Sequence, residues 1–104
     1  MSCTLNACVS AKHLRHRMQG YEVIATDYVV GNHIKGLGCR YAQLDVRSPE
    51  SISSFVSSLS GQSIDMLLNV AGTMAKHEDD SLQSVNKETL TRVLETNTFG
   101  PLLL

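Results

Sequence analysis

The chain has 104 residues, of which 42% are hydrophobic, and a formal net charge of −1 at pH 7. This length allows one domain at most, and the small charge gives no general affinity for nucleic acid or for an anionic membrane. No apolar run approaches the ~18 residues that a membrane span needs, and no signal peptide is apparent. Three cysteines without a Cys-x-x-Cys spacing favour a reduced, cytoplasmic protein.

The first predicted element is a helix over residues 7–18. Apolar residues recur there at helical spacing, with Asn6 as a plausible N-cap and Gly20 as the C-cap. Basic side chains crowd the remaining surface, which we interpret as a solvated helix face and not as a phosphate or nucleic-acid patch. A metal site is not favoured, because no third ligand follows at suitable spacing. The basic side chains are Lys12, His13, Arg15, His16 and Arg17.

A strand is predicted over residues 21–26, and Asp27 stands at its end. In a dinucleotide-binding fold, an acidic residue at this point hydrogen-bonds the adenosine ribose and favours NAD, whereas a basic neighbour accommodates the extra phosphate of NADP. The residue after Asp27 is Tyr28 and not arginine, so the pattern favours NAD. The alternative is that Asp27 only starts a turn.

The segment from Gly31 to Gly38 superficially resembles a phosphate-binding glycine loop. However, four residues separate Gly31 from Gly36, and the segment leads into a strand over residues 40–44 instead of a helix. Without a helix N-terminus, no row of free N–H groups is available for a pyrophosphate. We therefore interpret residues 31–38 as a flexible connection.

Asp45 and Val46 end that strand, and a crossover helix follows. Ser48 and Pro49 form a typical helix start, and Gly61 stops the helix. Serines occupy one side of this helix and an apolar stripe occupies the other, so its role is packing. The stripe consists of Ile52, Phe55, Val56 and Leu59.

The stretch over residues 64–72 predicts a strand that is buried on both faces and that ends at a ligand-binding edge. Five apolar residues surround Asn69, and Ala71-Gly72 closes the run. Open α/β sheets bind ligands beyond the carboxyl ends of their strands, where Asn69 stands. The alternative is a buried strand with a turn-capping asparagine.

A polar loop over residues 73–84 leads to a helix that starts at Asn86. The loop contains His77 and neighbouring acidic residues, which we interpret as solvated and not as a catalytic pair. Asn97 falls on the apolar stripe of the helix, so its amide needs buried hydrogen-bond partners. Pro101 has no N–H to donate to the Asn97 carbonyl, which a helix running through Pro101 would leave free. The alternative is a proline kink with a structural asparagine.

These motifs together resemble the short-chain dehydrogenase/reductase family. Asn69-Val70-Ala71-Gly72 is similar to its Asn-Asn-Ala-Gly signature, and Asn97-Thr98-Phe99-Gly100 resembles the segment of its active-site asparagine. The resemblance covers residues 21–104. It implies that Asn97 is catalytic and holds a water in a proton relay. It also implies cofactor-binding roles for Asp27 on the ribose, for Asp45 and Val46 beside adenine, and for Asn69, Ala71 and Gly72.

The expected fold is α/β: a partial Rossmann-like, doubly wound parallel sheet in a single partial dinucleotide-binding domain over residues 1–104. The family opens with a strand and a Thr-Gly-x-x-x-Gly-x-Gly turn, and both are expected to be missing or vestigial here. Only residues 1–6 precede the first helix, and none is a glycine. The first strand belongs between the second and the fourth. Either Cys3-Thr4-Leu5 forms a stub of it, or the sheet has a gap at its centre.

The family's catalytic serine and Tyr-x-x-x-Lys are also missing, since none of Tyr21, Tyr28 and Tyr41 has a lysine four residues later. The resemblance therefore predicts a fragment or truncated isoform of an NAD(P)-dependent oxidoreductase that binds its cofactor weakly and is inactive alone. Its full-length relatives transfer hydride between nicotinamide and a carbonyl or alcohol substrate. The alternative functions are a non-catalytic protein that binds a full-length relative or another partner, in a homo- or hetero-oligomer, and a gene-model artefact.

Overall fold

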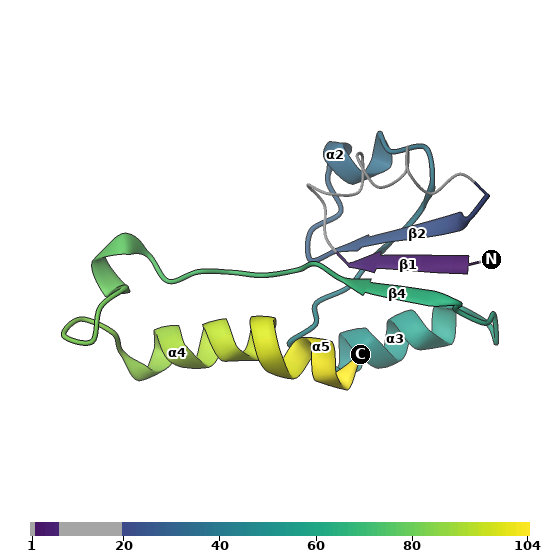
Figure 1. Ribbon diagram of the computed structural model, residues 1–104. Coiled ribbons are helices and arrows are strands. Elements are labelled where there is room, and N and C mark those ends of the chain that lie inside the picture. The colour runs from purple at the N-terminus through teal and green to yellow at the C-terminus, as the bar shows by residue number, and fades with distance from the viewer. Residues whose placement is uncertain (1, 7–19) are drawn as a thin grey trace.

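The chain folds around a parallel β-sheet with helices on both faces (Figure 1). The computed structural model describes residues 2–6 and 20–104, so the helix predicted over residues 7–18 lies outside the described residues. The strands are β1 (Ser2–Asn6), β2 (Glu22–Asp27), β3 (Arg40–Gln43) and β4 (Met66–Asn69). The helices are α2 (Asn32–Lys35), α3 (Pro49–Ser58), the 3₁₀ turn η1 (His77–Asp79), α4 (Lys87–Leu94), the π turn η2 (Glu95–Phe99) and α5 (Gly100–Leu103).

Within the described residues the sheet has four strands in the order β3-β2-β1-β4, and every pair is parallel. This topology confirms the expected partial Rossmann-like fold. Of the two alternatives for the first strand, the structure has the short strand: β1 fills the centre of the sheet with five residues. Asn6 at its end is in register with Thr26 of β2 and with Asn69 of β4. The carboxyl ends of the strands therefore lie along one edge.

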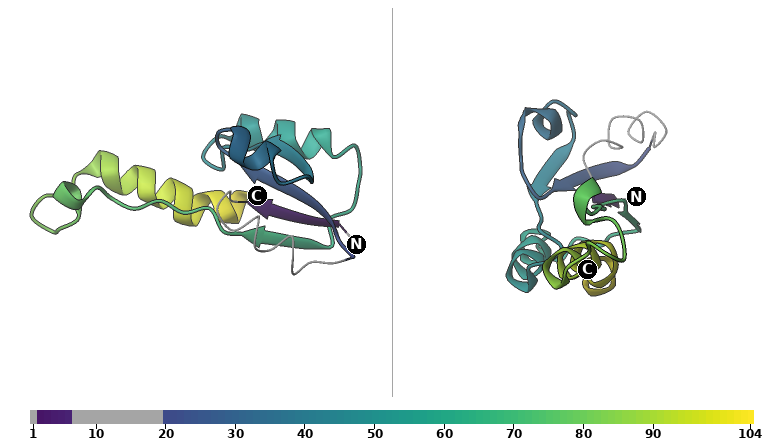
Figure 2. Two further views of the ribbon diagram at one scale, coloured as in Figure 1. Left: turned by 90° about the horizontal axis from the view of Figure 1, so that it is seen from above. Right: turned by 90° about the vertical axis from the view of Figure 1, so that its left-hand side faces the viewer.

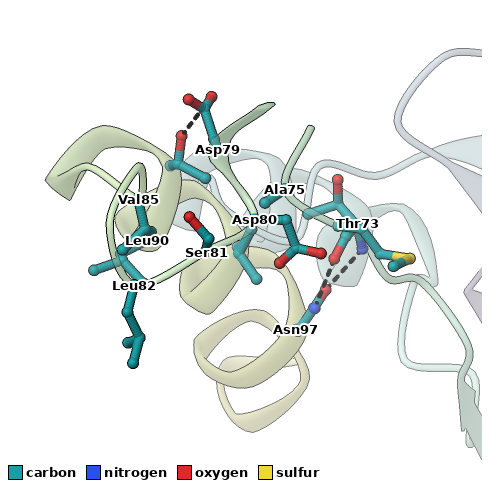
Figure 3. A pocket seen from close by; sticks show the side chains of 12 residues that line it. Thr73, Ala75, Asp79, Asp80, Ser81, Leu82, Val85, Leu90 and Asn97 are labelled. Carbon is teal, nitrogen blue, oxygen red and sulfur yellow. Dashed lines mark hydrogen bonds between the residues drawn. The ribbon is translucent and has the colours of Figure 1, made fainter. Parts of the chain in front are cut away.

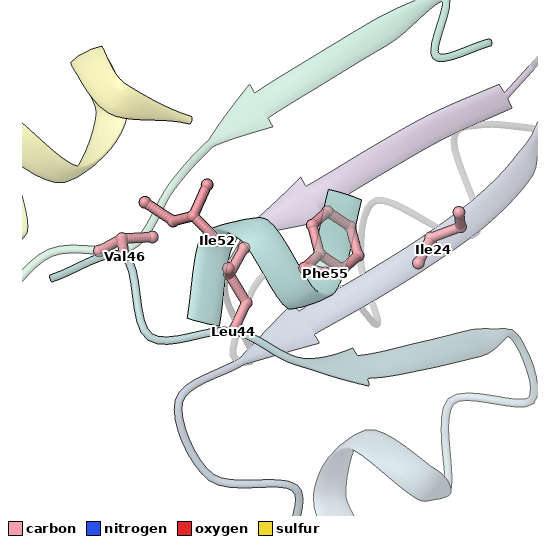
Figure 4. Packing of buried hydrophobic residues seen from close by; sticks show 5 residues of the cluster. All are labelled: Ile24, Leu44, Val46, Ile52 and Phe55. Atoms are coloured by element: carbon pink, nitrogen blue, oxygen red, sulfur yellow. The ribbon is translucent and has the colours of Figure 1, made fainter. Parts of the chain in front are cut away.

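Strand β2 is buried on both faces and separates two hydrophobic clusters. Val23 and Ala25 face the cluster that contains residues of the α2 segment. Ile24 faces the opposite cluster, to which α3 contributes (Figure 4). The second cluster consists of Ile24, Leu44, Val46, Ile52 and Phe55. Because successive side chains of a strand point to opposite faces, one apolar strand organises both layers of this small core.

The interpretation of residues 31–38 as a flexible connection is wrong. Asn32–Lys35 form the single helical turn α2, and the side chain of Ile34 is fully buried. Leu37, three residues later, is also buried in the same cluster. Two apolar anchors one turn apart hold this segment against β2, and glycine content alone gave no indication of that anchoring.

Strand β4 is less buried than its apolar sequence predicted. Met66 and Leu67 are 38% and 40% exposed, and Asn69 is exposed as well. In the described part of the chain β4 pairs with β1 alone, so it forms one end of the sheet. The prediction of burial on both faces is therefore wrong: Met66 and Leu67 point to opposite faces of the sheet, and both are partly exposed.

Helix α3 begins as predicted. The Ser48 hydroxyl accepts a hydrogen bond from the Ser51 N–H at 3.1 Å, and Pro49 occupies the first turn. The pKa of Glu50 in that turn is lowered by its own backbone N–H and by the Ser48 hydroxyl. The stripe is narrower than predicted, since Ile52 and Phe55 are buried but Val56 is 51% exposed.

The last helix runs from α4 through the π turn η2 into α5 and continues past Pro101. The Asn86 side chain caps it by accepting from the Thr89 N–H at 2.9 Å, as predicted. This helix and α3 lie on the same face of the sheet, and α4 extends beyond the sheet (Figures 1 and 2). The molecule is consequently elongated, with extents of 48 × 26 × 22 Å.

Candidate functional site

The structure places the predicted ribose, adenine and signature residues along the carboxyl edge of the sheet. Asp27 is the last residue of β2, Asn69 is the last residue of β4, and Asp45 lies two residues beyond β3. The strand order puts them in the sequence Asp45, Asp27 and Asn69 along that edge. A parallel α/β sheet binds its ligands in the crevice at this edge.

Asp45 is held by Arg47. The carboxylate accepts from the backbone N–H of Arg47 at 2.9 Å, and from Nε and Nη2 of its side chain, both at 3.1 Å. The side-chain hydrogen bond from Arg47 is the main reason that the pKa of Asp45 is lowered. The guanidinium also lies 5.4 Å from the centroid of the Tyr28 ring. Asp45 is therefore ionised and oriented, and three of its roughly four acceptor positions are occupied.

Val46 turns its side chain into the protein. It is 6% exposed and belongs to the cluster around Ile24. A Cβ on Gly100 would lie 2.7 Å from its Cβ and Cγ2 atoms, so α5 approaches this residue as closely as a glycine allows. Of the two residues predicted to flank adenine, Asp45 alone presents a side chain that is partly exposed.

Gly72 and Asn97 are brought together although 25 positions separate them in the sequence. A Cβ on Gly72 would lie 3.6 Å from Oδ1 of Asn97. Ala71 next to it is half-buried. The end of the signature segment and the helix with the predicted catalytic asparagine therefore meet at one place.

The Asn97 amide clamps the first peptide groups beyond Gly72. Its Oδ1 accepts from the Thr73 N–H at 2.8 Å, and its Nδ2 donates to the Thr73 carbonyl at 2.8 Å. Arg92 adds hydrogen bonds to the Thr73 hydroxyl at 2.9 Å and to the Met74 carbonyl at 3.1 Å. The prediction that Asn97 is buried is wrong, because its amide meets an exposed loop on the side of the helix. Both polar atoms of the amide are nevertheless hydrogen-bonded, and both bonds are to the backbone of Thr73.

The helix widens where Asn97 stands. Residues Glu95–Phe99 form a π turn, and the Gly100 N–H donates to the Glu95 carbonyl five residues earlier. Single π turns inside α-helices are rare, and those that occur often lie at functional sites. The wider turn also lets the helix continue through Pro101, whose ring and missing N–H disrupt a regular α-helix.

Replacing Asn97 by alanine is expected to release the loop at Thr73. Two hydrogen bonds are lost, and we expect the free energy of unfolding to fall by about 1–2 kcal/mol. Hydrogen exchange at the Thr73 amide is expected to accelerate, because its acceptor is removed. The control is Thr98→Ala at the next, exposed position. Equal exchange rates at Thr73 in both variants would contradict the clamp.

A cavity of about 540 Å³ lies between the loop after Thr73 and α4 (Figure 3). Asn97 is the only residue of the predicted site that lines it, so this cavity is separate from the strand ends of β2 and β3. On its wall the Thr89 hydroxyl donates to Oδ2 of Asp79 at 3.4 Å. Asp80 in the loop also lines the cavity and is exposed.

In residues 2–6 and 20–104, no three His, Cys, Asp or Glu side chains converge as a metal site needs, and this includes the loop with His77. Over the same residues, none of the helices has the length and hydrophobicity that a membrane crossing requires.

Sequence reasoning missed four side chains that shape this region. Arg47 orients Asp45, Arg92 helps to hold the loop, Thr73 is the partner of Asn97, and His33 contacts Asp27. Their partners lie 2 to 24 positions away in the sequence. Only the Asp45–Arg47 spacing is short enough to suggest a pair from the sequence, because an acid and a base stand two positions apart just after β3.

Comparison with known proteins gives structural matches alone. Neither a protein-family model nor a curated protein matches the sequence. Among solved structures, serine dehydrogenase from Escherichia coli is 25% identical with a TM-score of 0.80, and covers 99% of this chain and 51% of its own. The closed form of serine dehydrogenase complexed with NADP+ is 26% identical with a TM-score of 0.81, covering 99% and 45%.

A third similar structure is the 3-ketoacyl-(acyl-carrier-protein) reductase from Brucella melitensis complexed with NADH. It is 18% identical with a TM-score of 0.80, and the alignment covers 98% of this chain and 46% of that protein. The chain thus spans about half the length of the solved structures it matches. Two other matched structures, each 22% identical to this chain, are described as short-chain dehydrogenases, so the fold resembles that family as the sequence motifs predicted.

Proposed function

We propose that this chain, which has the fold of one half of a short-chain dehydrogenase/reductase, is the dinucleotide-binding part of an NAD(P)-dependent oxidoreductase. The observation that carries the proposal is the placement of Asp27, Asp45 and Asn69 along the carboxyl edge of a parallel sheet. Nicotinamide cofactors in two of the structural neighbours support it. The chemistry of the whole enzyme is hydride transfer between nicotinamide and a carbonyl or alcohol substrate.

The residues at this edge fit an adenosine group. Asp27 has a partly exposed carboxylate at the end of β2, where it would accept from the ribose hydroxyls. Asp45 retains about one acceptor position, which suits the adenine amino group. Val46 would contribute its backbone, because its side chain is buried. Since Asp27 carries a negative charge that repels a 2′-phosphate, we propose that NAD is preferred over NADP.

The other end of the cofactor would pass the signature segment. Asn69 and Ala71 would line it, and Gly72 leaves the space that a side chain would take. The side-chain amide of Asn97 is already bonded to Thr73. The backbone carbonyl of Asn97 is therefore the group that would hold a water for proton transfer. The helix runs through Pro101, as this role requires.

We further propose that the 104-residue chain binds the cofactor weakly and does not transfer hydride alone. None of its tyrosines is followed by lysine four residues later, so the family's general acid and the lysine that lowers its pKa are not in this sequence. The first glycine is Gly20, so the residues before β2 contain no glycine-rich turn for the pyrophosphate.

The test is an NMR titration of the chain with NAD+. Amide shifts are expected at residues 27, 45–46 and 69–72, with a dissociation constant of about 1 mM, which corresponds to roughly 4 kcal/mol of binding energy. Asp27→Ala is expected to weaken binding, whereas Asp65→Ala, at an exposed position before β4, is not. Shifts confined to other surfaces, or none, would contradict cofactor binding. Reduction of carbonyl compounds with NADH above a buffer blank would contradict the proposed lack of activity.

A second candidate function is a non-catalytic protein that binds a full-length relative or another partner in an oligomer. Apolar side chains exposed on the last helix favour it. They are Leu90 (49%), Leu94 (45%), Phe99 (49%), Leu102 (81%) and Leu103 (62%). Size-exclusion chromatography and activity assays of a full-length relative mixed with this chain provide the test. Unchanged size and unchanged activity would exclude that partner.

A further inference from the structure

The ribose acid proposed above has a histidine bonded to it. Nε2 of His33, on α2, lies 3.3 Å from Oδ2 of Asp27. The two side chains are 49% and 25% exposed, so both are accessible to a ligand at the end of β2. Histidine is the side chain whose charge ordinarily changes between pH 5 and 8. Asp27 therefore has beside it a group that can exist as a neutral base or as a cation.

The position of the imidazole is built into the fold. A Cβ on Gly31 would lie 2.8 Å from Cε1 and from Nδ1 of His33, so the ring occupies the space that any other residue at 31 would fill. The helix turn that carries the ring is anchored by Ile34, which is fully buried. Glycine at 31 leaves room for the imidazole beside Asp27, and the buried isoleucine anchors the turn that carries it.

Within residues 2–6 and 20–104, the elements beside Asp27 carry three further charged groups at this edge: Asp45, Arg47 and Lys35. Asp45 and Arg47, which follow β3, are bonded to each other and neutralise each other's charge. Arg47 also lies against Tyr28, the residue after Asp27. Lys35 shares α2 with His33, and its side chain is exposed. Within the part of the chain that the structure describes, the Asp27 carboxylate contacts the side chain of His33.

We propose that His33 is a specificity-determining residue that controls how strongly the ribose end of the site rejects a 2′-phosphate. With a neutral imidazole, Asp27 keeps its full negative charge, accepts from the 2′-hydroxyl and repels a phosphate. With an imidazolium, the charge of Asp27 is offset and a cation faces the ligand. Discrimination against the phosphorylated cofactor is therefore weaker when the imidazole is protonated than when it is neutral. This inference rests on the proposed function, because it takes Asp27 as the ribose acid.

The experiment compares ADP-ribose with 2′-phospho-ADP-ribose as probes of the adenosine end. Dissociation constants of the full chain are measured by NMR titration at pH 6 and pH 8, for the wild type and for His33→Gln. The phosphate itself titrates near pH 6, but it does so identically for both proteins. For each protein, discrimination is the dissociation constant of 2′-phospho-ADP-ribose divided by that of ADP-ribose. The informative quantity is the discrimination of the variant divided by that of the wild type at the same pH.

At pH 6 we expect His33→Gln to discriminate against the phosphorylated probe about threefold more strongly than the wild type, as suits one exposed charge pair. At pH 8 we expect the two proteins to agree. Gly31→Ala, which displaces the ring, is expected to behave like His33→Gln. His77→Gln, at an exposed histidine in η1, serves as the matched control and is expected to behave like the wild type.

The outcomes separate the two proposals. Equal ratios in the wild type, His33→Gln and Gly31→Ala at pH 6, with both probes bound at the strand ends, would overturn the role of His33 and leave the proposed function standing. Failure of the wild type to bind either probe at either pH would overturn both. Because His33 is half exposed, its substitution leaves the core intact, and the Gly31 variant retests the same contact independently.

Discussion

Replacement of Phe55 by alanine is expected to lower the free energy of unfolding by about 3–5 kcal/mol. The ring is 6% exposed and packs between α3 and the sheet with Ile24, Leu44 and Ile52 (Figure 4). Typical domains are stable by only about 5–15 kcal/mol, so this one change is expected to remove much of the total. The measurement is urea unfolding followed by circular dichroism at 25 °C.

The matched control is Val56→Ala on the same helix. Val56 follows Phe55 directly but is 51% exposed, and its loss is expected to cost less than about 1 kcal/mol. Both variants place alanine in α3, so the difference between their stabilities reports the burial of the replaced side chain and not the helix propensity of alanine. Similar losses for the two variants would show that α3 does not pack on the sheet through Phe55.

Gly100→Ala is expected to destabilise the protein by about 2 kcal/mol through overpacking. Helix propensity alone predicts the opposite, because alanine is favoured over glycine in a helix by about 1 kcal/mol. The structure decides the sign: the new Cβ would lie 2.7 Å from Val46 and 3.0 Å from the Glu95 carbonyl. Thermal and urea unfolding of the variant provide the measurement, and a gain in stability would refute the close contact.

The control for Gly100 is Gly72→Ala. A Cβ at that position would meet only Oδ1 of Asn97, at an ordinary contact distance of 3.6 Å, so little change is expected. The contact at Gly100 also has a functional consequence. It joins the Asp45-Val46 segment after β3 to the helix that carries Asn97. Enlarging Gly100 is therefore expected to perturb the amide shifts of Val46 and of Asn97 together, which an NMR spectrum of the variant reports.

The geometry of the edge links these two expectations to cofactor binding. Asp27 ends the strand that both clusters bury, and Asp45 follows a strand that α3 supports through Leu44. Both carboxylates are thus held by elements whose packing depends on residues far from the edge. The Phe55 substitution is expected to weaken the binding of NAD+ because part of the protein unfolds. The Asp27 substitution is expected to weaken binding while the protein stays folded.

Much of the local structure was predictable from the sequence. The caps Ser48 and Asn86 act on backbone groups three residues away, so their patterns are complete within one turn of helix. Asp27 and Asn69 were placed at strand ends by apolar runs that stop beside them. The parallel sheet followed from the alternation of strands and helices, and the family resemblance supplied its expected order.

Other features depended on contacts between distant segments. The pattern of residues 31–38 suggested flexibility, yet Ile34 and Leu37 anchor them to β2. Asn97 was assigned to a buried stripe, yet its amide bonds to Thr73, 24 positions away. Strand β4 was judged buried from its composition, but the exposure of its side chains depends on what packs against each face of the sheet. None of these outcomes is encoded within one element.

The sequence by itself thus determined where α3 and α4 begin, because each cap acts within one turn of its helix. It also placed Asp27 and Asn69 at strand ends, because an apolar run stops beside each of them. The tertiary structure alone decided that five residues of β1 close the centre of the sheet, that Val46 turns inward against Gly100, and that His33 rests on Asp27. Those arrangements arise from burial and close packing among segments far apart in the chain, which no local pattern specifies.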